Sequence, residues 1–374
     1  MTHCLILLHS FGGGAENIAL ELAGRLNPAR FHIVLACVRH IPALARRRPA
    51  GIRLCMPERP GFFAALRNAA RIRHLAQRSD VVLGSLELQS IFWAALAAPG
   101  RAVGWLHKDV AGYLAQKGYL YGRLYKFLLG WALGRCGAVA CVSRGILESS
   151  ACLWPRLQPR LRVLWNPVNT ADLRRRAAAP LPESLRACFA APVILGVGRL
   201  ERQKAFHLLL EAHALLLRRG MRQHLCILGE GSERARLEAD IRRLDIRDTV
   251  YLPGFMEPAP VMARARALAL SSLFEGFSLV LVEALCVGLP VVAADCPSGP
   301  GEVLAHGAYG ALTPVGDAVA LADALQKVLE KKPDPAVLEA GKSRAEVFAP
   351  EATVAAWEEL LAEVGKVSGK NNGE

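Results

Sequence analysis

The sequence contains no long hydrophobic run, although 52% of its residues are apolar. A helix that crosses a bilayer needs about 18 or more consecutive apolar residues, and no uncharged stretch of that length occurs. We therefore expect no spanning helix. The first residues, Met-Thr-His-Cys-Leu-Ile-Leu-Leu, also lack the basic segment of a signal peptide, and they predict a first strand instead.

Several motifs that would define a reaction class are missing. The ten cysteines are scattered, without a Cys-x-x-Cys pair or a His/Cys cluster, which argues against a structural zinc site. We expect them to be reduced and mostly buried, as in a cytosolic protein. No Asp-x-Asp motif stands between a strand and a loop, and neither a Gly-x-Ser-x-Gly elbow nor a Walker loop occurs. We therefore predict no metal-bridged diphosphate and no cofactor.

Acidic residues are scarce in the first half of the chain. Residues 1–186 carry 26 Lys+Arg against 9 Asp+Glu, whereas residues 187–374 carry 20 against 24. The basic half predicts an anionic partner: a phosphate-bearing acceptor, a membrane surface or nucleic acid. Nucleic acid is the weakest of these, because no helix-turn-helix, RNP or zinc-finger pattern is found.

Buried strands alternate with amphipathic helices along the chain. In the second half, strands at 193–198, 225–229, 249–252 and 267–271 alternate with helices at 203–219, 233–244 and 258–266. This pattern predicts an α/β protein with parallel sheets covered on both faces. We expect two such domains, 1–185 and 186–348, with a basic linker rich in Pro and Ala at 172–191, a C-terminal helix at 349–366 and a disordered tail at 367–374.

The stretch 272–302 holds two carboxylates, Glu275 and Glu283, in apolar surroundings. An ionised carboxylate is costly there unless a partner stabilises it. Ser278 is a suitable N-cap for a helix that carries Glu283, and Gly288 and Pro290 end that helix. Glu275 then lies in a loop that precedes a helix N-terminus, which is an anion-binding arrangement. The alternative from pattern alone is a buried strand with two structural carboxylates.

Cations and glycines follow several predicted strands. Arg199 and Lys204 come after the strand that begins at residue 193, where ligands bind in open parallel sheets, and two cations there would neutralise a diphosphate. Solvated turn residues are the alternative. Gly229 and Phe255 also follow strands, and their segments could equally be ordinary turns.

In the first half, His107 stands at a strand end with Asp109 two residues later, and a glycine loop at 12–14 joins the first strand to a helix. A lone histidine is more often structural, but this position favours a role in the site. The loop allows close approach to a phosphate, although a tight turn explains it nearly as well. It lacks the G-x-G-x-x-G pattern and no acidic ribose partner follows at the right distance, so the sequence argues against a dinucleotide site.

Two basic helices are predicted, at 61–78 and 117–135. The first carries Arg67, Arg71 and Arg73, for which a solvated face is the default over membrane contact. The second combines Tyr and Trp with Lys and Arg, which suits a membrane interface, although most such stripes are core.

Several sequence motifs together resemble those of a known family. Glu275-x7-Glu283 followed by Gly288-Leu-Pro-Val-Val resembles the E-x7-E signature of family 4 glycosyltransferases. Gly-Arg-Leu-x-x-x-Lys at 198–204 resembles the family's diphosphate-binding segment, and Gly-Glu-Gly at 229–231 its nucleotide loop. The resemblance implies a GT-B fold: two Rossmann-like domains with parallel sheets facing across a cleft, and a C-terminal helix that crosses back onto the first domain.

The resemblance also implies roles for residues. The catalytic group would be Glu275, His107, Arg199 and Lys204. Donor contacts would come from Gly13, Gly14, Arg199, Lys204, Gly229, Phe255, Glu275, Gly276, Phe277, Ser278, Leu279 and Glu283. Gly13 and Asp109 would face the acceptor, and no metal ligand is implied.

The implied reaction is sugar transfer with retention of anomeric configuration. The donor would be a UDP-sugar, carrying N-acetylhexosamine or hexose, and the acceptor a lipid-linked or otherwise anionic surface glycan. A cytoplasmic location, with peripheral contact to the inner membrane face through the basic domain, follows from the same reasoning. The alternatives are a GDP-mannose-dependent mannosyltransferase and, in another class, a non-catalytic protein that binds nucleotide-sugars or glycans.

Overall fold

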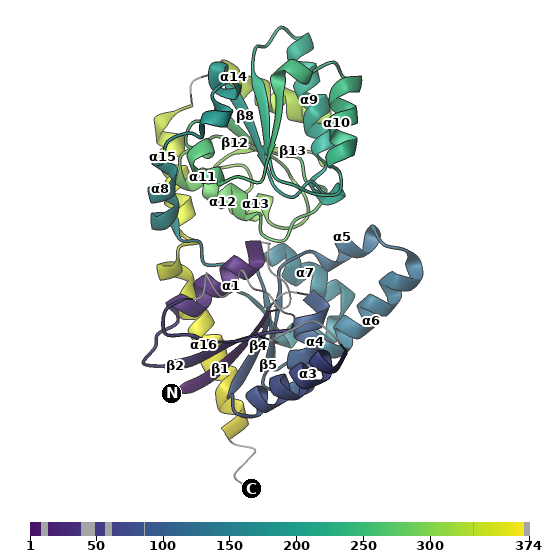
Figure 1. Cartoon of the computed structure of the whole chain (residues 1–374), viewed down its shortest axis with the longest axis vertical. Coiled ribbons are helices and arrows are strands. Elements are labelled where there is room, and N and C mark those ends of the chain that lie inside the picture. Colours follow the sequence, from purple (N-terminus) through teal and green to yellow (C-terminus); the bar gives the residue numbers. More distant parts are fainter. Residues whose placement is uncertain (9–13, 39–48, 57–61, 86, 332, 370–374) are drawn as a thin grey trace. The chain divides into compact units, whose positions relative to one another are not determined.

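The structure is a computed structural model that describes residues 1–8, 14–38, 49–56, 62–85, 87–331 and 333–369. The chain forms two compact units (Figure 1). Unit 1 comprises Met1–Val168 and Pro350–Glu374, and unit 2 comprises Asn169–Ala349.

A seven-stranded parallel sheet, as far as the chain is described, forms the centre of unit 1, in the order β3-β2-β1-β4-β5-β6-β7. Its strands are β1 (Thr2–Leu8), β2 (Phe31–Cys37), β3 (Arg53–Cys55), β4 (Val81–Ser85), β5 (Ala102–Leu106), β6 (Ala138–Cys141) and β7 (Leu161–Val163). Every position of β4, β5 and β6 is buried. These strands are continuous apolar runs because helices cover a parallel sheet on both faces.

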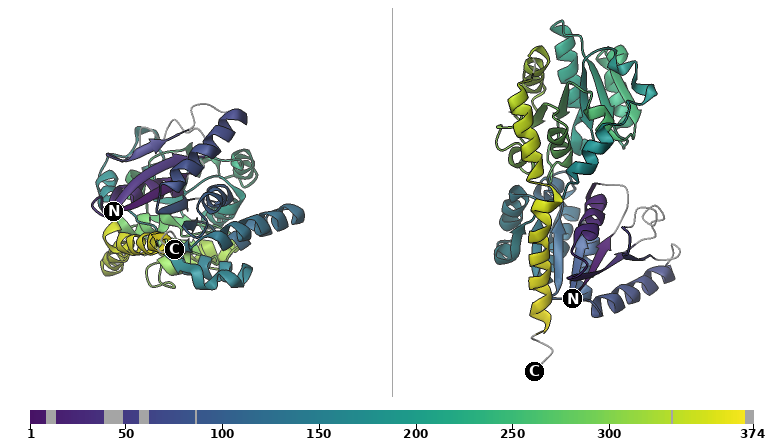
Figure 2. Two further views of the ribbon diagram at one scale, coloured as in Figure 1. Left: turned by 90° about the horizontal axis from the view of Figure 1, so that it is seen from below. Right: turned by 90° about the vertical axis from the view of Figure 1, so that its left-hand side faces the viewer.

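Two groups of helices cover this sheet. One group is α3 (Phe62–Gln77), α4 (Glu87–Ala97) and α6 (Tyr119–Arg135), in which α4 contacts both β4 and β5. The other is α1 (Gly14–Arg25) and α16 (Pro350–Gly369), which contact each other and β4; α16 is the long yellow helix in Figure 2. Two shorter helices, α5 (Val110–Ala115) and α7 (Arg144–Leu153), pack against each other.

The C-terminal helix α16 is part of unit 1 because its apolar face is buried there. Trp357 is fully buried, its ring lies 4.4 Å from that of Trp105, and its Nε1 donates to the carbonyl of Trp165 at 3.1 Å. Glu358 accepts from the backbone N–H of Asn27 at 2.7 Å. The helix continues to Gly369, so the tail predicted to be disordered from 367 begins as helix, and 370–374 lie outside the described residues.

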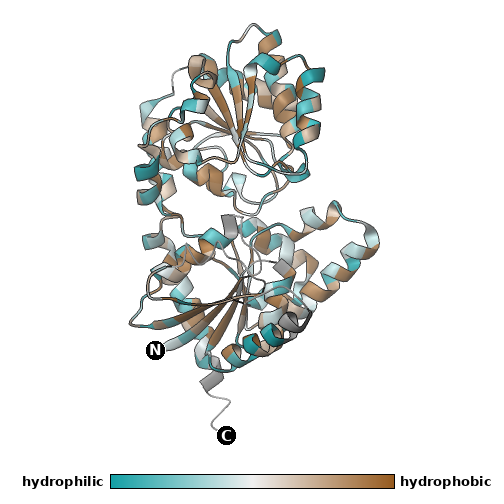
Figure 3. Cartoon of the chain, viewed as in Figure 1, coloured by the Kyte–Doolittle hydropathy of each residue, from teal (hydrophilic) through white to brown (hydrophobic). Residues whose placement is uncertain are grey.

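Unit 2 is built on a six-stranded parallel sheet, counted over the part of the chain that is described, in the order β10-β9-β8-β11-β12-β13. Its strands are β8 (Val193–Val197), β9 (His224–Leu228), β10 (Val250–Gly254), β11 (Ala267–Leu270), β12 (Val291–Ala294) and β13 (Ala311–Thr313). In both units the strands are the most apolar segments and the outer helices carry the hydrophilic residues (Figure 3).

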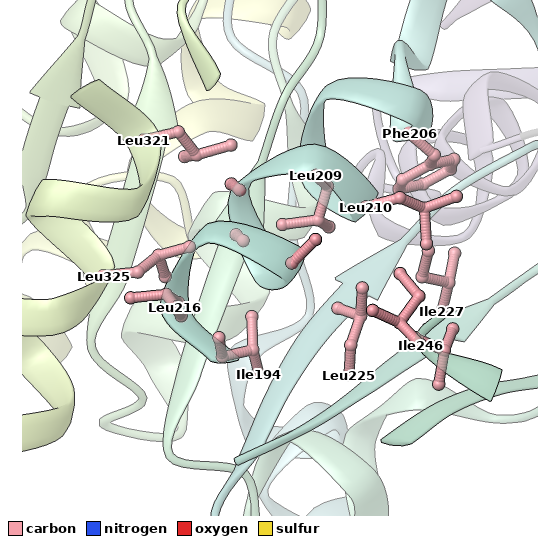
Figure 4. Packing of buried hydrophobic residues seen from close by; sticks show 14 of the residues in the cluster. Ile194, Phe206, Leu209, Leu210, Leu216, Leu225, Ile227, Ile246, Leu321 and Leu325 are labelled. Carbon is pink, nitrogen blue, oxygen red and sulfur yellow. The ribbon is translucent and has the colours of Figure 1, made fainter. Parts of the chain in front are cut away.

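The core of unit 2 lies between the sheet and three helices, α9 (Phe206–Arg218), α10 (Arg234–Arg243) and α14 (Ala318–Glu330). Leu209, Leu216 and Ile194 have no exposed surface, and Leu325 of α14 packs with them (Figure 4). A second helix group is formed by α8 (Thr170–Ala177), α11 (Pro258–Met262), α12 (Leu279–Cys286) and α15 (Pro335–Glu346), which contact one another.

The second compact unit begins at Asn169, earlier than the predicted boundary at 186, and the segment 172–191 is not a linker. It contains α8 and two 3₁₀ turns, Glu183–Leu185 and Cys188–Ala190. Leu173 is buried, and Thr170 donates from its hydroxyl to Glu346 of α15 at 3.0 Å. The arginines that suggest an exposed linker occupy the outer face of a helix whose inner face packs on unit 2.

The strand order of unit 2 reverses direction between β8 and β11. Strands β9 and β10 lie on one side of β8, whereas β12 and β13 lie beyond β11. The chain therefore leaves the carboxyl ends of β8 and β11 in opposite directions, which opens a crevice where α/β proteins bind ligands.

Candidate functional site

Lys204 and Glu275 meet at this crevice. Lys204 follows β8 and Glu275 follows β11, and the Lys204 Nζ lies 2.6 Å from the Glu275 Oε1. The side chains are only 17% and 8% exposed, so water screens the ion pair weakly. The Ser272 hydroxyl donates to the same carboxylate oxygen at 2.6 Å. Two predicted site residues, 71 positions apart, are thus held in contact.

The loops that carry this ion pair are bonded to each other along their backbones. Gln203 donates from its side-chain amide to the carbonyl of Phe274 at 2.8 Å, and its own carbonyl accepts from the N–H of Leu273 at 2.9 Å. The Ser271 hydroxyl donates to the Lys204 carbonyl at 2.8 Å. These bonds fix the positions of the lysine and the carboxylate without any ligand. Gln203, Ser271 and Ser272 were not identified as site residues from the sequence. The signal that could have found the two serines is their position directly after a buried strand.

Glycines let the neighbouring loops approach closely. Gly229 has a φ of +145°, and a Cβ there would lie 1.9 Å from the carbonyl oxygen of Gly198. Gly254 has a φ of +87°, and a Cβ there would lie 2.8 Å from the Glu230 carboxylate. The ends of β8 and β9 therefore approach so closely that only glycine fits at position 229, whereas at position 254 glycine is favoured by its positive φ.

Two predicted donor-binding side chains project from the strand ends into solvent. Arg199 is exposed and forms no ion pair with any residue that the structure describes. Phe255, directly after β10, is 83% exposed, which is unusual for a phenylalanine. Both are open to a ligand: the guanidinium suits a phosphate, and the ring suits a planar base.

The start of α12 has the predicted position but a different local structure. Ser278 occupies the N-cap position as predicted, but with a left-handed φ of +61° and without the side-chain hydrogen bond that makes serine a favourable cap. Its hydroxyl is buried without a hydrogen-bond partner among the described residues. Phe277 is buried against Phe348, and Gly299 packs on its backbone, which holds the chain in this conformation. Gly276 is buried beside them, and Leu279 begins the helix.

Glu283 lies in the middle of α12, as predicted. Burial raises the pKa of its carboxyl from 4.5 to about 6; Arg176 lowers it and Glu257 raises it. Arg176 already donates to Glu257 at 2.6 Å and to Asp172 at 2.8 Å. Within the described part of the chain the Glu283 carboxylate accepts no hydrogen bond, so its side-chain oxygens are available to hydroxyl donors.

His107 and Asp109 belong to unit 1 and have different surroundings. The ring of His107 lies 4.3 Å from that of Trp105, and neither ring nitrogen has a partner among the described residues. Burial lowers the pKa of His107 to about 3, so the ring is neutral and offers one donor and one acceptor. Asp109 is buried and caps α5, accepting from Ala111 and Gly112 and from the Ser149 hydroxyl. Its carboxylate is therefore already satisfied within the fold.

The predicted glycine loop is described only at its end. Gly14 begins α1, whereas Gly13 lies outside the described residues. In the described part of the chain, no group of three or more His, Cys, Asp or Glu side chains is placed to hold a metal ion. No helix there is long and apolar enough to cross a membrane.

Comparison with known proteins places both halves among glycosyltransferases. Residues 190–344 match the family model "Glycosyl transferases group 1", and residues 12–172 match "Glycosyltransferase Family 4". An N-acetylgalactosaminyltransferase of Campylobacter jejuni that acts on a diphospho-undecaprenol-linked acceptor is 31% identical over 225 residues, which are 60% of this chain and 59% of that protein. The lipopolysaccharide 1,6-galactosyltransferase of Escherichia coli is 31% identical over 193 residues, 50% of this chain and 48% of that one.

Solved structures share the fold. HepE of Anabaena, crystallised with UDP and glucose, matches with a TM-score of 0.76 and 21% identity over 99% of this chain and 100% of that one. Sucrose-phosphate synthase of Thermosynechococcus elongatus matches with a TM-score of 0.77 and 18% identity over 98% and 100%. The two parallel α/β units are thus those of a GT-B fold.

Proposed function

The chain belongs to glycosyltransferase family 4, and on that premise we propose that it transfers a sugar from a UDP-sugar to a lipid-linked or surface-glycan acceptor, with retention of anomeric configuration. The observation that carries the proposal is the Lys204–Glu275 ion pair at the point where the strand order of unit 2 reverses. A buried cation and a buried carboxylate are expensive to maintain for stability alone, because their desolvation offsets much of their attraction.

In this proposal the donor lies along the carboxyl edge of the unit 2 sheet. Arg199 and Lys204 bind the diphosphate, and Glu283 accepts hydrogen bonds from the ribose hydroxyls. The backbone at Gly229 and the ring of Phe255 flank the base. Glu275, oriented by Lys204 and Ser272, binds hydroxyls of the sugar. The segment Gly276–Leu279 adds backbone contacts, and the neutral ring of His107 contributes a further polar contact to the donor sugar.

The chemistry follows from these roles. The bond between the sugar and the diphosphate breaks, the acceptor hydroxyl forms the new glycosidic bond, and its proton leaves with UDP. Negative charge develops on the departing diphosphate, and two cations stabilise it: Lys204, which Glu275 holds in place, and the exposed Arg199. Charge stabilisation of this kind is usually the largest catalytic contribution. The proposal needs no metal ion, because Arg199 and Lys204 supply the positive charge.

Support for a UDP donor comes from relatives. HepE was crystallised with UDP-glucose, and the Campylobacter relative transfers N-acetylgalactosamine to a lipid-linked diphosphate. The basic character of residues 1–186 suits an anionic acceptor of that chemical class. Asp109, at the N-cap of α5, and the loop at Gly13 and Gly14 remain the proposed acceptor side of the site.

A thermal-shift screen against UDP, GDP, ADP and their sugar conjugates, without and with magnesium, tests the proposal. A ligand that binds only the folded state adds about 2.7 kcal/mol at ~100-fold above its Kd, which is readily measured. We expect UDP compounds to stabilise the protein without magnesium, and Glu283→Ala to lose most of that shift. Glu339→Ala, on the exposed surface of α15, is the matched control and keeps it.

Other outcomes of the screen separate the alternatives. Selective stabilisation by GDP would indicate the mannosyltransferase. Stabilisation by a UDP-sugar in the screen, together with no transfer to lipid-linked acceptors in a separate activity assay, would favour the non-catalytic binding protein. A flat response to every nucleotide would contradict the proposal.

A further inference from the structure

Helix α6 exposes a stripe of large apolar side chains. Leu120, Leu124, Phe127 and Trp131 are 82%, 58%, 69% and 38% exposed. Their spacing of four, three and four residues places them on one side of the helix, since residues three and four apart share a face. Figure 3 shows apolar segments repeating along α6 between hydrophilic ones.

Most of this stripe is left uncovered by the described residues of unit 1. The opposite side of α6 carries its buried residues, Tyr125, Leu129, Ala132 and Leu133, and contacts α4. At the edge of the stripe Trp131 touches Phe92, with ring centroids 5.1 Å apart. Single exposed apolar residues are ordinary, but a contiguous row of them on one helix marks an interaction surface.

Cations border the stripe on both sides. At the 3.6-residue period of an α-helix, Arg123 and Lys126 fall on one flank and Arg135 on the other. Lys117 precedes the helix, and its Nζ lies 5.1 Å from the centroid of the Tyr113 ring. Arg123 donates to the Tyr119 hydroxyl at 2.7 Å. The sequence holds no Asp or Glu from residue 110 to residue 147, so nothing acidic on these elements neutralises the row.

We propose that this face of α6, the Leu120 stripe with its flanking Lys and Arg residues, binds the surface of an anionic lipid bilayer. The helix lies in the plane of the interface, with the apolar row among the acyl chains and the cations at the phosphates. Tyr119 and Tyr121, which are 71% and 51% exposed, lie at the depth where tyrosine is favoured. The inference is independent of the donor chemistry proposed above.

Charge favours a bilayer over a second copy of the chain. In a symmetric dimer through this face, the same cations would meet across the interface with no acidic residue between them. An anionic surface instead offers a counter-charge to each one. The other basic helix, α3, is less suitable, because the Arg71 Nη1 already donates to the carbonyl of Met56 at 2.8 Å.

Vesicle flotation of the full chain tests the inference, with vesicles of phosphatidylcholine alone and mixed with phosphatidylglycerol. We expect binding only to the anionic vesicles. The triple variant Leu120→Gln, Leu124→Gln, Phe127→Gln should weaken it by about 10-fold or more, because the inserted apolar area is lost. The matched control is Val315→Gln, Val319→Gln, Val337→Gln, which changes three exposed apolar residues of unit 2 and leaves binding intact.

Charge variants provide a second, independent arm, since they leave the apolar row and the helix core unchanged. Arg123→Glu with Lys126→Glu should reduce binding to anionic vesicles by about 10-fold or more, whereas Arg67→Glu with Arg73→Glu on α3 should reduce it less. Unfolding temperatures of all variants report whether they fold.

Three results would overturn the inference. The first is that the α6 variants fold and bind the anionic vesicles as tightly as the wild type. The second is loss of binding on changing α3 but not α6. The third is a wild-type dimer that the triple variant converts to a monomer without any lipid binding, which would show the face to be a contact between copies.

Discussion

Glu283 has the most informative environment among the candidate site residues, because its carboxylate accepts no hydrogen bond from any side chain or backbone group in the part of the chain that the structure describes. Its carboxyl is largely removed from water, and this desolvation raises its pKa to about 6 and so favours the protonated form over that of a free glutamate. Hydroxyl donors of a bound ribose would supply the stabilisation that the protein omits. Lys204 and Glu275 differ, since each satisfies the other before a donor binds.

The raised pKa of Glu283 predicts how stability depends on pH. Between about pH 4.5 and about pH 6 the native state holds a proton that the unfolded chain has released, so its stability falls as the pH rises. The loss amounts to about 2 kcal/mol and is complete above the folded-state pKa. In Glu283→Gln without nucleotide, thermal unfolding should show a gain over the wild type that grows through this range and then stays constant.

Nucleotide affinity should follow the opposite trend. Protonation of Glu283 removes an acceptor, so the affinity for UDP decreases as the pH falls below about 6, and Glu283→Gln binds weakly at every pH. Glu339→Gln, exposed on α15, should behave as the wild type in both assays. If the stabilities of the wild type and Glu283→Gln changed in parallel with pH, the pKa of the Glu283 carboxyl would not be raised in the native state.

At the scale of elements, the glycines at the strand ends allow a test of how the loops after β8 and β9 pack against each other. Gly229→Ala introduces a Cβ 1.9 Å from the Gly198 carbonyl oxygen, in a conformation with φ of +145°. The two loops must separate, at a cost of about 2 to 4 kcal/mol, and UDP binding should be lost with them. Chemical unfolding and UDP titration measure the two effects.

Gly220→Ala is the matched control, because Gly220 also has a positive φ, +81°, but a Cβ there meets nothing within 4 Å. It should cost about 1 to 2 kcal/mol from backbone strain alone and leave UDP binding intact. Equal losses of stability and of UDP affinity in the two variants would mean that the close contact between the loops at Gly198 and Gly229 contributes to neither.

Elements were predictable from sequence where local signals agree. The helix around Glu283 follows from Gly288 and Pro290 behind it, and the strands follow from short apolar runs. The left-handed conformation of Ser278 and its missing capping bond were not predictable, because Phe277 packs against Phe348 and Gly299, which are distant in sequence. The Lys204–Glu275 contact was not predictable either, since it depends on β8 pairing with β11.

At the scale of the whole molecule, the proposed donor-binding residues and the basic helices belong to different units. Unit 2 holds the proposed donor residues, and unit 1 holds the basic helices. The boundary between them escaped prediction because Arg174–Arg176 suggest an exposed linker, whereas Leu173 and Ala177 of the same helix are buried. Trp357 anchors the C-terminal helix in unit 1, where its indole N–H donates to the carbonyl of Trp165. The sequence alone does not indicate this contact.

Photolabelling with 5-azido-UDP-glucose, followed by mass spectrometry of the labelled peptides, tests the central claim most directly. The account predicts a label that UDP competes away and that lies in unit 2 after β8, β9 or β10, near Arg199, Gly229 or Phe255. A UDP-competed label confined to unit 1, or to the far end of the unit 2 sheet around Val291, would contradict it.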